Sequence, residues 1–177
     1  MSIVTLDGEL IHYEVLGRGR PVFFLHGWVG SWRYWIPAMQ AASASYRTYA
    51  LDFWGFGDTA KQADHYLLDE QVKLIGNFME KLGIVKAPLV GHGLGAVAAL
   101  EFALQSPEKV DRLMLTGLPV SNIALNTRLK TATITELVDW LLAKLPWAEP
   151  VRSEAAKTDP RAVKTFLTAV QDLNLLD

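Results

Sequence analysis

The sequence predicts an α/β fold: a mostly parallel sheet that begins with an antiparallel hairpin and carries helices on both faces. Beyond about residue 20, short apolar runs alternate with longer amphipathic stretches, the pattern of repeated strand–helix units. Some of these runs are apolar throughout, such as 22–25, as is typical of parallel strands buried on both sides. Two earlier strand-like runs are separated by Asp7-Gly8, a dipeptide that favours a tight hairpin turn.

The bulk composition indicates one globular domain and excludes several classes of function. The chain has 177 residues, of which half are hydrophobic and a fifth are charged, enough for a substantial core. Its net charge is −2 without a basic stripe, so we expect neither nucleic acid nor an anionic membrane surface as a partner. Cysteine is absent, and no signal sequence or apolar run of membrane-spanning length is present. The default expectation is a cytoplasmic protein.

The elements of the core are predicted in order from periodicity and from residues that stop helices. The predicted strands are 3–6, 10–16, 22–25, 48–51, 88–90 and 110–115. The predicted helices are 31–44, disturbed by Pro37, then 68–82, closed by Gly83, and 94–105, ended by Ser106-Pro107. Beyond Pro119 the pattern changes to amphipathic helices alone, one over about 134–145 and one over 161–176.

The centre of the sequence is Gly91-His92-Gly93-Leu94-Gly95, between a strand and a helix with almost no loop. This spacing is that of a G-x-S-x-G nucleophile elbow, a strained turn whose flanking positions must be small. The central position, which would carry the reactive hydroxyl, is Gly93. The sequence therefore predicts the turn without its nucleophile.

Three motifs, each after a strand and in the same order, strongly resemble those of the α/β-hydrolase fold family. They are 23–28 (FFLHGW), 52–58 (DFWGFGD) and 91–95 (GHGLG), and they look most like the esterase, epoxide-hydrolase and C–C hydrolase branch. The resemblance covers about residues 1–119, which would form an incomplete α/β-hydrolase core. Residues 120–177 resemble the start of the helical cap of that family.

The resemblance implies a role for each motif. The backbone N–H groups of Trp28 and Leu94 would form an oxyanion hole, in which pre-aimed donors stabilise developing charge. His26, Gly27, Gly91, His92 and Gly95 would set the geometry of the loop and elbow. Of the two histidines, His26 is expected to brace its loop, and His92 is expected to be structural and to point away from the pocket. The segment 52–58 is expected to shape a turn rather than to act in catalysis.

A group of aromatic residues has two interpretations, which the sequence leaves open. One is packing of a large aromatic core, and the other is an apolar pocket for a small apolar ligand or ester. The residues are Trp28, Trp32, Trp35, Phe53 and Trp54. His12 and His65 have no evident partner, so surface or packing roles are expected, and the spacing of the four histidines predicts no metal site. No cofactor is expected.

The catalytic set that the family would need is incomplete. Gly93 carries no hydroxyl, no histidine follows His92, and the chain has no position that matches the catalytic acid. The sequence therefore predicts a protein of an ester-hydrolysing lineage that is inactive as it stands. The alternatives are a pseudoenzyme that binds a small ligand and an interaction module that uses an edge strand.

The strand 110–115 would lie at an exposed edge, because no further strand is predicted after it. Such an edge is a hazard unless something covers it. The chain would then be a fragment or truncated form of a longer protein, or a whole protein that self-associates.

Overall fold

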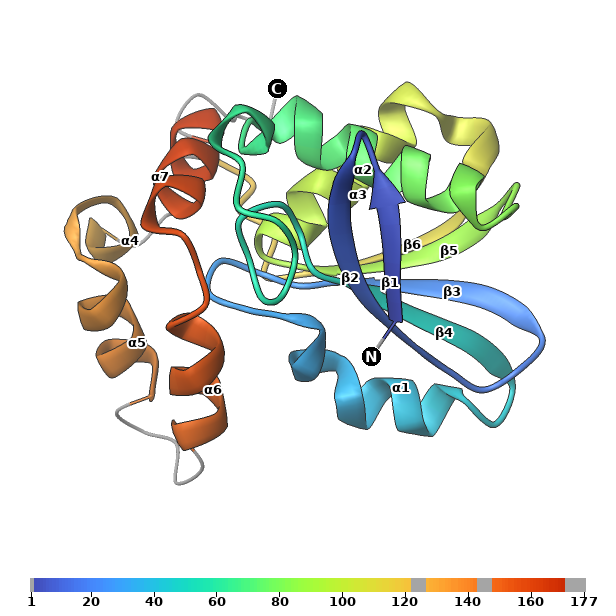
Figure 1. The fold of residues 1–177 in the computed structure, drawn as a ribbon, viewed down its shortest axis with the longest axis horizontal. Helices are drawn as coiled ribbons and strands as arrows, with labels where there is room; N and C mark the ends of the chain where they lie inside the picture. The colour runs from blue at the N-terminus through green and yellow to red at the C-terminus, as the bar shows by residue number, and fades with distance from the viewer. Residues whose placement is uncertain (1, 122–126, 143–147, 171–177) are drawn as a thin grey trace.

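The computed structural model describes residues 2–121, 127–142 and 148–170, in which six strands form one sheet with the order β1-β2-β4-β3-β5-β6 (Figure 1). The strands are β1 (Ser2–Leu6), β2 (Glu9–Leu16), β3 (Arg20–Leu25), β4 (Tyr46–Leu51), β5 (Ala87–His92) and β6 (Val110–Thr116). β1 and β2 pair antiparallel, β2 pairs antiparallel with β4, and the pairs β3–β4, β3–β5 and β5–β6 are parallel. The hairpin turn is Asp7-Gly8, with φ of 52° and 82°. The predicted fold class is confirmed.

Helices cover both faces of the sheet. In Figure 1, α2 (Leu68–Lys81) and α3 (Leu94–Gln105) lie above it, and the 3₁₀ helix η1 (Trp32–Trp35) continues into α1 (Ile36–Ala42) below it. Pro37 lies in the first turn of α1, where its missing N–H breaks no helical hydrogen bond. The helix is therefore not interrupted at Pro37, and the 3₁₀ helix changes into an α-helix just before it. Two short 3₁₀ helices complete the core: η2 (Ala63–His65) and η3 (Pro107–Lys109).

Alternate residues of the strands divide the core into two layers. Phe23 and Leu25 of β3 belong to the larger cluster, which also contains Ile75 and Phe78 of α2. Val22 and Phe24 point to the other face, where they pack with Met39 of α1. Because successive side chains of a strand point to opposite faces, the continuous apolar run 22–25 supplies both layers.

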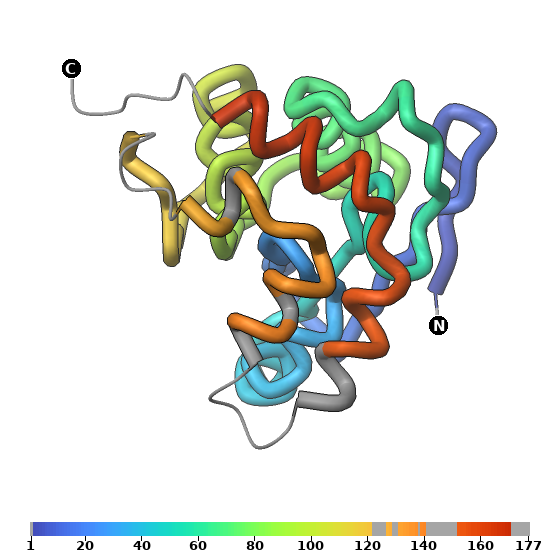
Figure 2. Tube along the Cα trace, turned by 90° about the vertical axis from the view of Figure 1, so that its left-hand side faces the viewer, coloured from blue at the N-terminus to red at the C-terminus, as the bar shows by residue number. Residues whose placement is uncertain are grey.

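The tail consists of helices at one side of the sheet, in front of the core in Figure 2. They are α4 (Thr127–Thr131), α5 (Ile134–Leu142), α6 (Ala148–Ala155) and α7 (Pro160–Ala169). Two of them correspond to the predicted tail helices, whose remaining residues 143–145 and 171–176 lie outside the described residues. None of the described helices has both the length and the hydrophobicity to span a bilayer.

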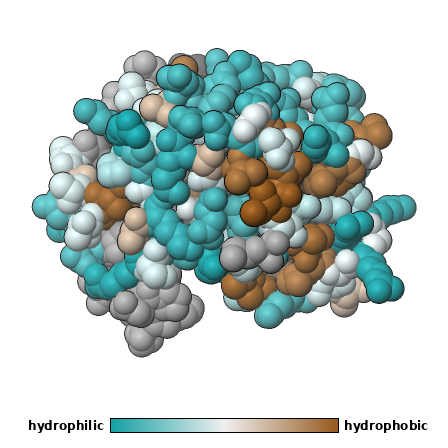
Figure 3. Space-filling model, viewed as in Figure 1, coloured by the Kyte–Doolittle hydropathy of each residue, from teal (hydrophilic) through white to brown (hydrophobic). Residues whose placement is uncertain are grey.

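Both edges of the sheet expose apolar side chains. On β6, Met114 is 60% exposed and Leu113 is 37% exposed. At the other edge, Ile3 and Leu10 of the β1–β2 hairpin are more than half exposed, and hydrophobic atoms gather over this hairpin in Figure 3. The sheet therefore ends at each side without a covering element among the described residues.

Candidate functional site

A single residue, Gly93, joins β5 to α3. Its φ of 55° and ψ of −114° are strained for any residue with a side chain. The Gly93 N–H donates to the carbonyl oxygen of Thr116, at 2.9 Å, which ties the turn to the end of β6. A strand, a one-residue turn and a helix thus follow one another at the position predicted from the sequence.

Positions 91 and 95, on either side of this turn, must be glycine because other backbone segments pass very close to them. A Cβ at Gly91 would lie 2.5 Å from the carbonyl oxygen of Gly95, and one at Gly95 would lie 2.2 Å from that of Leu25. These distances are far shorter than van der Waals contact. α3 can therefore pack onto β3 and β5 only because both positions lack side chains.

The space beside Gly93 holds the indole of Trp28. A Cβ at Gly93 would lie 3.1 Å from Cδ1 and from Nε1 of that ring, which is tight but not prohibitive. The half-buried Trp28 also packs against Val97 of α3, and its ring centre is 6.5 Å from that of Phe166 of α7. Trp28 thus connects the turn to the helical tail.

His26 braces the loop that carries Trp28. The Phe53 N–H donates to His26 Nε2 at 3.1 Å, so the ring proton is on Nδ1 and is donated to the carbonyl oxygen of Gly27 at 2.9 Å. Complete burial lowers the pKa of His26, which favours this neutral form. The loop is close to the turn, since a Cβ at Gly27 would lie 2.8 Å from His92 Nδ1.

Two backbone N–H groups near Gly93 are available as donors. Leu94 is the first residue of α3, where an N–H has no acceptor within the helix. The Trp28 N–H has no hydrogen-bond acceptor among the described residues. Their use as an oxyanion hole stays a prediction.

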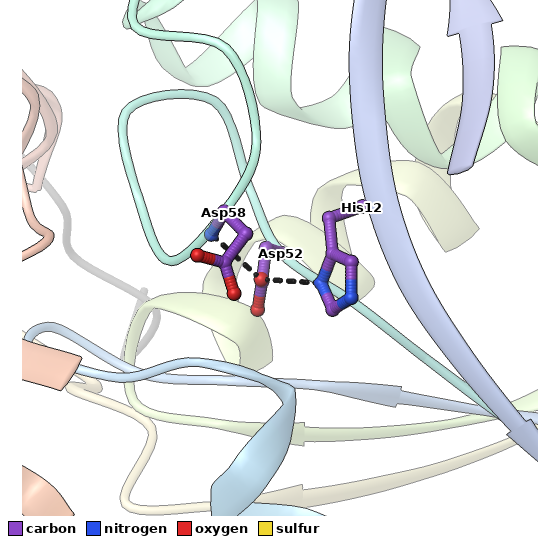
Figure 4. A group of neighbouring side chains, drawn as sticks. All are labelled: His12, Asp52 and Asp58. Carbon is purple, nitrogen blue, oxygen red and sulfur yellow. Dashed lines mark hydrogen bonds and ion pairs between the residues drawn. The ribbon is translucent and has the colours of Figure 1, made fainter. Parts of the chain in front are cut away.

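The segment 52–58 is built around the fully buried carboxylate of Asp52 (Figure 4). Its Oδ1 accepts from the Trp32 N–H at 2.7 Å, and its Oδ2 accepts from the Asp58 N–H at 3.1 Å. A Cβ at Gly57 would lie 2.2 Å from Oδ2, so the turn closes tightly over the carboxylate. This geometry confirms that the segment shapes a turn.

His12 is buried and partnered, which the sequence did not reveal. Its Nδ1 lies 2.9 Å from Asp52 Oδ2, so a packing role is confirmed and a surface role is wrong. Donor atoms of His12, Asp52 and Asp58 all lie within 4.8 Å of one another, as in a metal site. However, Asp52 already accepts these hydrogen bonds and Asp58 pairs with Lys157 Nζ at 3.0 Å. We assign the group to the turn, and the absence of a metal stays a prediction.

The pair of His12 and Asp52 makes stability depend on pH. Burial acts to lower the pKa of His12, but the hydrogen bond and charge of Asp52, together with the charges of Asp58 and Glu14, raise the pKa above its ordinary value. The pair therefore stabilises the folded protein fully below about pH 6.5, the pKa of His12 in the unfolded chain. The stabilisation is lost as the pH rises through the higher pKa of His12 in the folded protein.

We expect the loss in unfolding free energy caused by His12→Gln to be larger at about pH 6 than at about pH 8.5. Urea unfolding of both proteins at the two pH values measures it. Comparing the two proteins cancels the contributions of the other histidines. A difference that grows with pH would contradict the assignment.

The structure does not gather the five predicted aromatic residues around one pocket: Trp28 lies against Gly93, and the other four divide between the two cores. Phe53 and Trp54 lie in the larger core, where Trp54 stacks on His65 with ring centres 4.4 Å apart. Trp32 and Trp35 pack against the smaller core on the other face. Core packing therefore describes these residues, with one exception.

Trp35 also lines a cavity of about 260 Å³ beside the turn at Gly93. Its walls are mostly apolar, and the lining residues are His26, Gly27, Tyr34, Trp35, His92 and Thr116. The side chain of His92 is exposed here, and partial burial lowers its pKa, so it is neutral at pH 7. Tyr34 and Thr116 were not predicted as site residues, because nothing in their local sequence distinguishes them.

Comparisons with known proteins agree with this architecture. A family model described as alpha/beta hydrolase fold matches residues 20–158. The 2-hydroxy-6-oxo-6-phenylhexa-2,4-dienoate hydrolase of Comamonas testosteroni is 30% identical over 97% of this chain and 68% of its own length. The bifunctional epoxide hydrolase 2 of Rattus norvegicus is 28% identical over 98% of this chain. The chain spans only 32% of that relative.

Solved structures show the same fold. A hydrolase from Pseudomonas aeruginosa superposes with a TM-score of 0.83 at 18% identity, over 98% of this chain and 73% of that one. A meta-cleavage product hydrolase from Pseudomonas fluorescens gives a TM-score of 0.79 at 28% identity, over 95% of this chain and 67% of that one. The described helices and strands therefore form part of a larger architecture in these proteins.

Proposed function

The chain belongs to the α/β-hydrolase fold family, and we propose that it is the core and partial cap of a hydrolase of small apolar esters or related acyl bonds, disabled at Gly93. The observation that carries the proposal is the conformation of Gly93 between β5 and α3. It has the strained geometry that would present a nucleophile, with two available N–H groups nearby, but it has no side chain. Covalent catalysis needs an activated nucleophile, and Gly93 has no hydroxyl at the position where the turn would present one.

The purified chain is expected to hydrolyse p-nitrophenyl acetate and butyrate at a small residual rate above that of buffer, without the burst that an acyl-enzyme produces. Without the nucleophile and base, only the small rate due to binding and N–H donors would remain. Initial rates of p-nitrophenolate release measure this, with Trp28→Ala as a control for adventitious surface hydrolysis. Saturable turnover that a substitution at Gly93 or Trp28 abolishes would overturn the disabled state.

A second candidate function is binding of a small aromatic ligand without turnover, and the cavity favours it. Tyr34, Trp35 and His92 give it aromatic walls, and neutral His92 can donate or accept one hydrogen bond. Its volume of about 260 Å³ suits a single ring, below the roughly 300–1,000 Å³ of typical ligand sites.

Phenol is therefore expected to bind saturably and to raise the melting temperature, with a weaker effect in His92→Phe. A thermal-shift titration measures both. Benzene serves as the control for the hydrogen bond, since it fills the cavity without offering one. Equal shifts for the two proteins, or none for either, would count against this function.

We also propose that the exposed edge at β6 is covered in the assembled protein, by a further part of a longer protein or by a second copy. The support is the exposure of Leu113 and Met114 on a strand with one pairing partner in the described residues. Sedimentation of the chain at micromolar concentration distinguishes a dimer from a monomer with an open edge.

A further inference from the structure

The segment 154–161, which connects α6 to α7, lies on the turn 52–58. The Asp159 N–H donates to the carbonyl oxygen of Gly55 at 2.8 Å, and Tyr66 Oη donates to Asp159 Oδ2 at 2.8 Å. Asp159 also caps α7, because its carboxylate accepts from the Arg161 N–H at 2.9 Å. The tail is thus attached to the core here by hydrogen bonds, in addition to the packing of Ala162, Val163, Phe166 and Leu167 of α7 in the larger core.

Four charged side chains meet beside this contact, two from the core and two from the tail. Lys157 Nζ lies 3.0 Å from Asp58 Oδ1 and 3.1 Å from Glu154 Oε1. Arg33 Nη1 lies 3.0 Å from Glu154 Oε2 and 3.6 Å from Asp58 Oδ2. Each acid therefore contacts both bases, and two of these pairings, Lys157–Asp58 and Arg33–Glu154, join the tail to the core. We name Arg33, Asp58, Glu154 and Lys157 the charge cluster.

The charge cluster is partly removed from water, which makes it sensitive to the loss of one member. Glu154 is 3% exposed, and the other three side chains are about one-third exposed. Burial acts to raise the pKa of Asp58, but the hydrogen bond and charge of Lys157, together with the charges of His12 and Arg33, keep this pKa below its ordinary value. Removing one base would leave two carboxylates facing one cation in a site that is poorly hydrated.

On the other side of this contact, the tail closes the space around Gly93. The ring of Phe166 on α7 lies 6.4 Å from that of Phe53 and 6.5 Å from that of Trp28, centre to centre. Val170, just after α7, is buried against Val97 of α3. Any molecule that reaches Gly93 from this side must displace Trp28 and the helix that packs on it.

We propose that the charge cluster is a latch that holds α6 and α7 against the core and thereby keeps the space around Gly93 closed. Because α7 is also held by its side chains in the larger core, breaking the latch makes the tail open more often while the sheet and α1–α3 stay folded. The proposal goes beyond hydrolysis, since it describes how a ligand would reach Gly93 from the side that Trp28 and α7 cover.

The test uses a single introduced cysteine as a reporter, because the chain has none of its own. Val97→Cys places a thiol where Val97 is 4% exposed beneath Trp28 and Val170, so it reacts with a thiol reagent only when the tail opens. In this background we expect Lys157→Met and Asp58→Asn each to speed labelling by about tenfold, the scale of one broken partly buried pair. The double variant should label much less than about a hundredfold faster, because the two residues share one interaction.

Two controls separate the latch from general loss of stability. Lys73→Met removes an exposed lysine from its pair with Glu70, 2.6 Å away, and should leave labelling unchanged. Val22→Cys, the same substitution on the opposite face of the sheet, should label slowly with or without the latch. If Lys157→Met left the labelling rate of the thiol at position 97 unchanged, the proposal would be overturned. Equal acceleration of the thiol at position 22 would also overturn it, because the cluster would then act on the whole fold.

Discussion

Gly95→Ala is expected to destabilise the protein by at least about 3 kcal/mol, among the largest effects of any one-carbon change in this chain. The added Cβ would lie 2.2 Å from the carbonyl oxygen of Leu25 and 2.6 Å from that of His26. Both contacts are with backbone, which cannot rotate away, so α3 must move off the sheet. For a chain of this size the melting temperature should fall by about 10 °C, as measured by thermal unfolding followed by circular dichroism.

Gly76→Ala is the matched control, since both glycines lie inside helices. At Gly76 the nearest contact of a new Cβ is 3.2 Å, to the far end of the Phe102 ring, which can shift. Alanine also has the higher helix propensity, so the two effects should nearly cancel, within about 1 kcal/mol. If Gly95→Ala were as mild as Gly76→Ala, the close approach of α3 to β3 would be contradicted.

Asp52→Ala is expected to destabilise the protein by about 3–5 kcal/mol, the cost of breaking a buried charged network. The substitution would leave His12 Nδ1 and the N–H groups of Trp32 and Asp58 without their acceptor, in a site that water does not reach. The loss should be measured by urea unfolding, and the pH dependence assigned to His12 should weaken or reverse its sign, because burial still acts to lower the pKa of His12.

Two further variants serve as comparisons for Asp52→Ala: Asp52→Asn, which should have an intermediate effect, and Asp64→Ala, which is an exposed control. Asparagine keeps the size and one acceptor oxygen, so its loss should be about half as large, while its neutral side chain should still weaken or reverse the pH dependence. Asp64 is exposed, and its replacement should change stability by less than about 0.5 kcal/mol. A loss of that small size in Asp52→Ala would show that the turn does not depend on the carboxylate.

Much of the fold could be predicted because local patterns and packing agree. The helix 94–105 was predicted with its observed bounds, since a strained glycine starts it and Ser106-Pro107 ends it. The strands extend one or two residues beyond the predicted apolar runs, as β4 does to Tyr46, because pairing with a neighbour fixes polar residues as well. At residues 32–35 a 3₁₀ helix precedes the α-helix, and the helical spacing of apolar residues does not distinguish the two.

Less of the candidate site could be predicted, because its contacts join distant parts of the chain. His12 and Asp52 are 40 residues apart, and Lys157 meets Asp58 across 99 residues. The aromatic residues gave the same hydrophobic signal whichever face of the sheet they occupy. Only the course of η1 and of the turn 52–58 in the folded chain shows that Trp35 lies beside a cavity while Trp54 lies in the core.

The sequence by itself determined the α/β fold class, the glycine spacing of the turn and the absence of a hydroxyl at Gly93. These follow from covalent structure and from patterns within a few residues, where backbone sterics and hydrophobic periodicity act. Only the tertiary structure decided what surrounds that turn: the indole of Trp28 against Gly93, the carboxylate of Asp52 within its loop, and the charge cluster that attaches the tail. Such contacts depend on how elements pack, because burial and charge pairing gain their energy from groups that folding brings together.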